Sequence, residues 1–198
     1  INRNFENYLI FAYLPTGLDA ELFPELFPDA IVQIEDDPYL FKTKFKNIQF
    51  KSSAHVHGSR RKAKFAHMQQ LRGIYMSNKM KLEYEKQKNF VFDWAFRLRT
   101  DLFFYESDLN LNELNNENLY TTNFQNWGGL NDKFLLSSSK NMDIYSDLFN
   151  HVRKHKVTGW NAESISKNYL DMRNIPVKEL DYVKFNRIYS DGQESKDF

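Results

Sequence analysis

A long amphipathic helix pattern that leads directly into an apolar segment constrains the fold of this chain most. One helical face over about residues 61–88 is marked by side chains at steps of three and four: Phe65, Met68, Leu71, Tyr75, Asn78 and Leu82. The following segment, Phe90–Phe104, is largely apolar and predicts a buried strand that ends in a polar cluster. This helix and strand together predict an α/β domain with a mostly parallel central sheet flanked by helices.

Shorter segments extend this pattern on both sides. Strands or extended segments are expected near 7–13, 30–34, 119–122, 133–137, 174–177 and 183–188. Ser138 or Ser139 is expected to cap one helix, with Met142, Tyr145, Leu148 or Phe149, and Val152 buried. Asn161 is expected to cap another helix, whose buried face is Ala162, Ile165, Tyr169 and Met172. The polar segment 109–118 predicts a loop, and the tail from Ser190 is expected to fray.

Composition limits the class of protein. The 198 residues suffice for one domain with a substantial core, and no linker divides residues 1–198. The net charge of +1 gives no reason to expect a nucleic-acid partner, and the absence of Cys excludes disulfides, thiolate metal sites and a cysteine nucleophile. No apolar run reaches the roughly 20 residues of a membrane span. We expect a soluble, cytoplasmic protein. Because the chain begins at Ile1 without an initiating Met, the sequence leaves open that it is part of a longer polypeptide.

The polar cluster at the end of the predicted strand contains Arg97, Arg99 and Asp101. Side chains two positions apart on a strand share a face, so both guanidinium groups could bind one phosphate by charge-assisted hydrogen bonds. A carboxylate such as Asp101 can bind a divalent cation that holds a diphosphate. The alternative is an edge strand with solvated arginines, in which Asp101 only caps the next turn.

A second candidate block is Asn126-Trp-Gly-Gly-Leu-Asn-Asp-Lys. Gly128 and Gly129 allow the backbone to approach a ligand closely, and Trp127 offers a flat apolar face for a sugar ring. Asp132 is the first candidate for a general base. Glu163, in the first turn of a predicted helix, is the second. Both carboxylates also have purely structural explanations, as a turn cap and as a favourable charge at a helix start.

Basic and polar residues at the start of the long helix form a third group. Arg60, Arg61, Gln69 and Arg72 could contact a nucleotide or its phosphates, although such a helical face is more often simply solvated. His55 and His57 alternate in a way that would place both rings on one side of a strand, but a zinc site needs further ligands and a surface position is favoured.

The segment from Met80 to Phe104 resembles the helix and following strand of GT-A-type glycosyltransferases, the nucleotide-diphospho-sugar transferases. The blocks Arg97-Leu-Arg-Thr-Asp-Leu and Asn131-Asp-Lys-Phe-Leu-Leu-Ser-Ser, in this order, are similar to those of little-annotated bacterial, algal and viral members, among them a domain of a chlorella-virus protein. The resemblance covers roughly residues 60–190.

The resemblance implies a glycosyltransferase that moves a sugar from a UDP- or GDP-linked donor to a hydroxyl group of a glycan acceptor, with inversion. Such enzymes use an Asp-x-Asp motif to bind Mn²⁺ or Mg²⁺ and the donor diphosphate, which assigns Asp101 to the metal and Arg97 and Arg99 to the donor. Trp127, Gly128 and Gly129 would shape the acceptor side.

Arg99 stands where these enzymes have the first Asp, so a metal-independent enzyme and a non-catalytic nucleotide-sugar or glycan-binding module both remain open. A phosphoryl-transferring enzyme would need a glycine-rich phosphate loop, which this sequence lacks.

Overall fold

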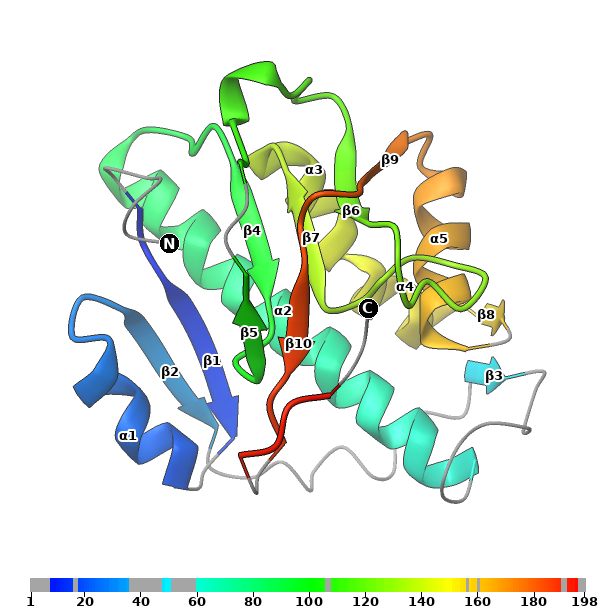
Figure 1. The fold of residues 1–198 in the computed structure, drawn as a ribbon, viewed down its shortest axis with the longest axis horizontal. Coiled ribbons are helices and arrows are strands. Elements are labelled where there is room, and N and C mark those ends of the chain that lie inside the picture. Colours follow the sequence, from blue (N-terminus) through cyan, green and yellow to red (C-terminus); the bar gives the residue numbers. More distant parts are fainter. Residues whose placement is uncertain are drawn as a thin grey trace. The chain divides into compact units, whose positions relative to one another are not determined.

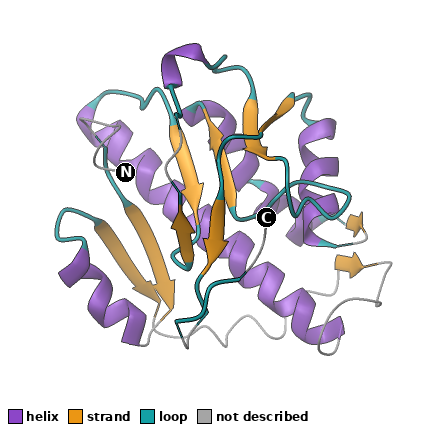
Figure 2. Cartoon of the chain, viewed as in Figure 1, coloured by secondary structure: helices purple, strands orange, loops and turns teal. Residues whose placement is uncertain are grey.

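The computed structural model describes residues 8–15, 18–35, 48–50, 60–105, 108–155, 157–159, 161–189 and 192–195. Two compact units are present (Figure 1). The first unit comprises Ile1–Val91 and Ser146–Thr158, and the second unit comprises Phe92–Tyr145 and Gly159–Phe198. Each unit contains both helices and strands, so the protein is of mixed α/β type (Figure 2).

The first unit begins with a strand, helix and strand arrangement. β1 (Phe11–Pro15) and β2 (Ile31–Glu35) pair in parallel, and α1 (Leu18–Leu26) connects them. Parallel neighbours require a crossover connection, which the helix provides. The strands predicted at 7–13 and 30–34 are therefore confirmed, with β1 displaced toward its carboxyl end.

The long predicted helix is confirmed as α2 (Arg60–Lys88). Met68, Leu71 and Asn78 are buried, as the periodicity predicts. Leu82 is exposed, however, so its predicted burial is wrong. The next buried residue of α2 after Asn78 is Lys81. Lys81 Nζ donates to Glu85 Oε2 at 3.1 Å, so two charges are buried as a pair. An ideal helix repeats every 3.6 residues, and a stripe drifts by one position over several turns.

The remaining elements of the first unit are short. α4 (Leu148–Lys154) packs on α2, where the rings of Tyr75 and Phe149 lie 5.4 Å apart. β3 (Ile48–Phe50) pairs with β8 (Val157–Gly159).

The second unit is built on a four-stranded sheet with the order β4-β7-β6-β9. Its strands are β4 (Ala95–Leu98), β6 (Leu119–Thr122), β7 (Phe134–Ser137) and β9 (Val177–Leu180). β7 runs antiparallel to both neighbours, and only β6 and β9 are parallel. The predicted mostly parallel sheet is therefore wrong. A loop without a helix joins β6 to β7, and such a connection pairs neighbouring strands antiparallel.

The strand predicted over Phe90–Phe104 is much shorter than expected. Only the four residues of β4 pair with β7. β5 (Leu102–Phe104) leaves this sheet and pairs antiparallel with β10 (Phe185–Arg187). Arg99 lies in the turn between β4 and β5, so the prediction that it shares a strand face with Arg97 is wrong. The apolar segment Phe90–Phe104 does not stay in one sheet, because β4 pairs with β7 whereas β5 pairs with β10.

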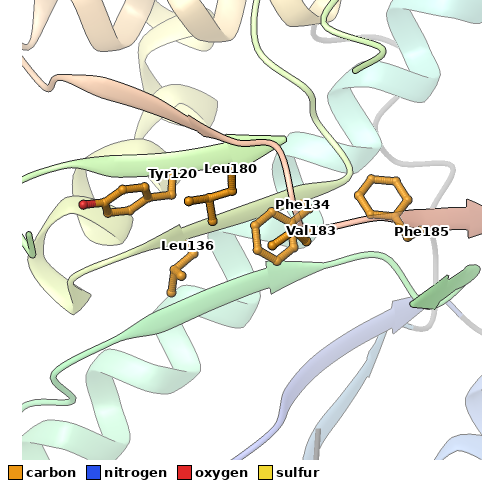
Figure 3. Packing of buried hydrophobic residues seen from close by; sticks show 6 residues of the cluster. All are labelled: Tyr120, Phe134, Leu136, Leu180, Val183 and Phe185. Carbon is orange, nitrogen blue, oxygen red and sulfur yellow. The ribbon is translucent and has the colours of Figure 1, made fainter. Parts of the chain in front are cut away.

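Buried aromatic and aliphatic side chains hold the sheets of the second unit together. The cluster consists of Tyr120, Phe134, Leu136, Leu180, Val183 and Phe185 (Figure 3). The rings of Phe104 and Phe185 lie 5.3 Å apart, which ties β5 and β10 to this core.

The two predicted helix caps are present. Ser138 Oγ accepts from the backbone N–H of Asn141 in α3 (Ser139–Ser146) at 3.4 Å. Asn161 caps α5 (Ala162–Met172) in a capping box with Ser164. The predicted buried residues of these helices are largely confirmed, but Met172 is 53% exposed at the end of its helix and its predicted burial is wrong.

Residues 192–195 are more ordered than their polarity suggests. Glu194 forms a β-bridge with Ile188, and Ser195 is only 5% exposed. The fraying predicted from Ser190 is therefore wrong for residues 192–195. Among the helices in the described parts of the chain, none combines the length and hydropathy that a membrane span requires.

Candidate functional site

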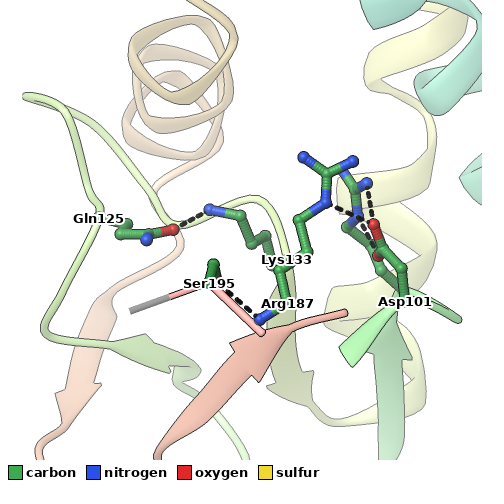
Figure 4. Close-up of polar contacts among 6 residues, drawn as sticks. Asp101, Gln125, Lys133, Arg187 and Ser195 are labelled. Atoms are coloured by element: carbon green, nitrogen blue, oxygen red, sulfur yellow. Dashed lines mark hydrogen bonds and ion pairs between the residues drawn. The ribbon is translucent and has the colours of Figure 1, made fainter. Parts of the chain in front are cut away.

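Asp101 lies at the centre of a charged cluster in the second unit. Arg99 donates to both of its carboxylate oxygens, from Nε to Oδ1 at 2.8 Å and from Nη2 to Oδ2 at 2.7 Å. Arg187 Nε also donates to Oδ2, at 2.7 Å (Figure 4). Burial acts to raise the pKa of Asp101, but these hydrogen bonds and charges outweigh it and the pKa lies below its usual value. Asp101 is therefore ionised at neutral pH and holds two guanidinium groups in place.

Arg187 is a member of this cluster that the sequence did not indicate. It lies in β10, whose pairing with β5 places it beside Asp101 although the two residues are 86 positions apart. The returning chain end supports it: the Arg187 N–H donates to Ser195 Oγ at 2.9 Å, and its carbonyl accepts from the Ser195 N–H at 2.7 Å (Figure 4). No local pattern distinguishes this arginine, because its role depends on which strand β5 chooses as its neighbour.

Arg97 lies on β4, next to this cluster. Its Nη1 atom is buried and has no hydrogen-bond partner among the residues that the structure describes. Burial lowers the pKa of its guanidinium. The positive charge of Arg99 also acts to lower this pKa, whereas Tyr145, Asp132 and Asp101 act to raise it. A buried cationic donor without a partner is costly to folding. The arrangement is typical of a group that awaits an anionic ligand.

The loop between β6 and β7 is held in shape by Asn131, which is completely buried. Its Nδ2 donates to Thr122 Oγ1 at 2.9 Å and to the Phe124 carbonyl at 2.8 Å. Its Oδ1 accepts from the Lys133 N–H at 2.8 Å, and its own N–H donates to Asn126 Oδ1 at 3.1 Å. One amide side chain therefore fixes the backbone on both sides of Asp132. The block Asn131-Asp-Lys was recognised in the sequence, but the bracing role of Asn131 was not.

The Trp127-Gly-Gly turn of this loop lies against the start of α5. The Trp127 carbonyl accepts from Asn161 Nδ2 at 2.9 Å, and the Leu130 N–H donates to the Glu163 carbonyl at 3.1 Å. A Cβ atom on Gly129 would lie 2.1 Å from the backbone carbon of Glu163, which is an impossible contact. Gly129 is therefore needed for the packing of this loop on α5, and the approach of the two glycines to a ligand stays a prediction.

We expect Gly129→Ala to lower the free energy of unfolding by at least about 3 kcal/mol, the upper part of the range for overpacking. The clashing atoms are backbone atoms, so no side-chain rotation relieves them. Urea denaturation of the purified variant measures the change.

Gly128→Ala is the matched control. Gly128 has φ +77°, which an alanine adopts at a cost of about 1 kcal/mol, and no atom lies within 4 Å of the added Cβ. Equal losses in the two variants would contradict the packing explanation.

Asp132 of this loop interacts electrostatically with Glu163 of α5. The pKa of Glu163 is raised to about 7, mainly by burial and also by the negative charge of Asp132, while a backbone hydrogen bond and the charge of Lys133 act to lower it. Lys133 Nζ also donates to Gln125 Oε1 (Figure 4). A carboxyl group that titrates near neutral pH suits proton transfer better than one with an ordinary pKa. By this criterion Glu163 is the better candidate of the two, and the general-base roles of Asp132 and Glu163 both stay predictions.

The other predicted residues are distributed as follows. Trp127 is 66% exposed on the loop, as a side chain that receives a ligand must be. Arg72 and Gln69 belong to α2 in the first unit. Arg72 pairs with Glu35 at the end of β2 and donates to the Tyr13 hydroxyl of β1 at 2.7 Å, so its guanidinium has protein partners. The side chains of Arg60 and Arg61, and both His55 and His57, lie outside the described residues.

A divalent cation does not fit the surroundings of Asp101. Mn²⁺ and Mg²⁺ need oxygen ligands, and both oxygens of this carboxylate already accept hydrogen bonds from Arg99 and Arg187. Within the described ranges, no three His, Asp or Glu side chains gather as a metal-binding group. Three arginines, Arg97, Arg99 and Arg187, lie at or beside the Asp101 carboxylate. The arrangement fits an anion instead.

Comparison with known proteins gives one match. The model of a family described as a domain of unknown function, DUF7796, matches residues 68–188. This region includes every residue of the charged cluster, the β6–β7 loop and Glu163. No curated protein and no solved structure matches the chain.

Proposed function

We propose that this chain, which belongs to the DUF7796 family, is a glycosyltransferase that moves a sugar from a nucleoside-diphosphate donor to a hydroxyl group of a glycan acceptor. One observation supports this most: three arginines, one with a buried unpartnered nitrogen, adjoin a pair of coupled carboxylates in the same unit. The arginines could bind the donor diphosphate, and a carboxylate could accept the proton of the acceptor hydroxyl, as such a transfer requires.

The arginine side of the site would bind the donor diphosphate. Arg97 would give its unpartnered Nη1–H to a phosphate oxygen. Arg99 and Arg187 are oriented by Asp101 and retain further N–H groups for the ligand. Guanidinium groups bind phosphate through paired, charge-assisted hydrogen bonds. They would offset the charge that develops on the diphosphate as it leaves.

The carboxylate side would activate the acceptor. In the ionised form, Glu163 would take the proton of the acceptor hydroxyl as its oxygen attacks the anomeric carbon. The new carbon–oxygen bond forms while the bond to the diphosphate breaks, and the diphosphate departs with the electron pair. Attack opposite to the leaving group inverts the configuration. Asp132 would keep the pKa of Glu163 high, and Trp127 with Gly128 and Gly129 would shape the acceptor side.

A GT-A-like fold is part of the proposal. Its support is the sequence resemblance of the two blocks that contain Arg97, Asp101 and Asp132, together with the parallel β1–α1–β2 arrangement of the first unit. Enzymes with the full Asp-x-Asp motif use a metal to bind the donor phosphates. In this proposal the positive charge of Arg99 binds them instead.

A second candidate function is a nucleotide-sugar or glycan-binding module without turnover. The observation that favours it is the complete pairing of Asp101, since this carboxylate is engaged in holding arginines. Binding would need only the arginine side of the site.

A panel of UDP- and GDP-linked sugars tests both functions. Donor binding is measured by calorimetry, and donor hydrolysis or transfer by release of the nucleotide. The transferase predicts binding and turnover with at least one donor. Binding without turnover would favour the module, and the absence of both would overturn the proposal.

Chelation is expected to leave donor binding unchanged within about twofold. The arginines and not a metal would compensate the diphosphate charge, because the Asp101 oxygens are already occupied. Calorimetry in EDTA and in Mn²⁺ compares the two dissociation constants. A tenfold or larger gain of affinity with Mn²⁺ would restore Asp101 as a metal ligand.

A further inference from the structure

The second unit contains a concave surface beside Trp94, which directly precedes β4. It is an open cleft of about 660 Å³. Small-ligand sites commonly have volumes of roughly 300–1,000 Å³, so a sugar unit or two would fit. Trp94 precedes β4 and Asp101 follows it, so Trp94 and Asp101 lie at opposite ends of this strand, and Arg97 lies between them.

One wall of the cleft is a supported aromatic surface. Trp94 is half-buried, and its ring lies 6.4 Å from that of Tyr120 in the core. Leu111 and Leu114 also line the cleft and pack against the same core cluster. A tryptophan held by the core on one side can present the remaining apolar surface to a ligand at little entropic cost.

Polar lining comes from the segment 110–118, which contains five asparagines as well as Leu111 and Leu114. Three of them have structural tasks. Asn110 caps the short 3-10 helix Leu111–Glu113. Asn115 accepts from the Glu117 N–H at 2.9 Å, and Asn118 Nδ2 donates to the Tyr120 hydroxyl at 3.2 Å. These contacts fix the backbone of the segment.

The other two asparagines have no such task. Asn112 and Asn116 line the cleft, are exposed, and make no side-chain hydrogen bond with another residue that the structure describes. Each amide offers two donors and an acceptor. Asp93 adds a carboxylate at the same cleft. The polar groups left unused by the fold therefore gather beside Trp94.

The charge of the lining selects the class of ligand. Among the residues that the structure describes, no Lys, Arg or His lines the cleft, so phosphate and other anions find no positive partner in this lining. Amides and a carboxylate pair well with hydroxyl groups, and an indole ring pairs with the apolar C–H face of a pyranose. We propose that this cleft binds a neutral saccharide, with Trp94 against the ring and Asn112, Asn116 and Asp93 on its hydroxyl groups.

This binding site does not depend on the proposed transferase activity. If the chain has both the transferase site and this cleft, the cleft would hold a distant part of the acceptor chain, because Trp94 and Asp101 lie at opposite ends of β4. Saccharide binding measured without any donor tests the cleft alone. The variant Arg97→Met, which alters the donor side, is expected to bind saccharide as the unchanged protein does.

An array of neutral oligosaccharides, followed by titration of the best binder with NMR detection, is the direct test. The double variant Asn112→Ala/Asn116→Ala should bind at least about tenfold more weakly, the effect of losing one to two neutral hydrogen bonds. Both side chains are exposed, so the variant is expected to fold. Trp94→Ala should lose binding completely.

Glu117→Ala is the matched control, since Glu117 is exposed in the same segment and does not line the cleft. Unchanged binding in this control, with loss in the double variant, would support the site. The absence of any bound neutral oligosaccharide on the array would overturn it. Equal affinity of the double variant and the unchanged protein would overturn it as well.

Discussion

Glu163→Gln is expected to lower kcat by about 100-fold or more, while the dissociation constant of the donor changes little. Glutamine keeps the size of the side chain but does not accept a proton, and loss of a general base commonly reduces rates by about 10²–10⁴. Steady-state kinetics with the best donor and acceptor, together with calorimetry of donor binding, give both quantities.

The pH dependence provides an independent check on the same residue. Since burial and Asp132 raise the pKa of Glu163 to about 7, the fraction in the base form increases through this pH. We expect kcat/KM of the unchanged protein to increase with pH until above about 7. Asp132→Asn removes the neighbouring charge and should move this midpoint to lower pH. An unchanged midpoint, with a rate loss in Asp132→Asn alone, would return the role of base to Asp132.

The free energy of unfolding should decrease over the pH range in which kcat/KM increases. The folded protein keeps the Glu163 proton to higher pH than the unfolded chain does, so between the ordinary value of 4.5 and about 7 the free energy of unfolding falls as pH rises. Glu163→Gln removes this contribution. The variant should therefore be at least as stable as the unchanged protein at pH 8, as thermal denaturation would show. A clear loss of stability would indicate that Glu163 is mainly structural.

Arg97→Met is expected to weaken binding of the donor nucleotide by about 100-fold. Hydrogen bonds to charged groups contribute about 1.5–3 kcal/mol each, and 1.4 kcal/mol corresponds to a factor of ten. Methionine fills much of the same space without the charge. Because Nη1 of Arg97 is buried and has no hydrogen-bond partner in the described part of the chain, its removal should leave the melting temperature unchanged or raise it.

Arg173→Met provides the comparison for this variant. Arg173 is exposed at the end of α5 in the same unit, and its guanidinium lies 5.1 Å from the ring centre of Tyr169. Its substitution should not change donor affinity. An Arg97→Met protein that is destabilised and still binds the donor normally would show that Arg97 serves the fold and not a ligand.

The parts of the fold that follow local rules were predictable. α2 could be placed from the spacing of its apolar residues, and β6 and β7 from short apolar segments bounded by polar turns. Asn161 could be assigned as a cap because it precedes an amphipathic segment. Each of these signals lies within the element itself, so no knowledge of distant residues was needed.

The candidate site was predictable only in part. Arg97, Arg99, Asp101, Asp132 and Glu163 were identified from the kind and position of their side chains. Their division of labour was not, because the pairing of Asp101 with two arginines and the coupling of Glu163 to Asp132 depend on contacts between elements.

The sequence by itself determined which segments become helices and strands and which charged residues stand at their ends, since periodicity, caps and turn residues act over a few positions. Only the tertiary structure decided the direction of the strands, the departure of β5 to pair with β10, and the arrival of Arg187 at Asp101. The physical reason is that strand pairing joins backbone groups of almost any sequence. The choice of neighbour is made by packing of the whole unit, and it placed Asp101 where its carboxylate orients two arginines.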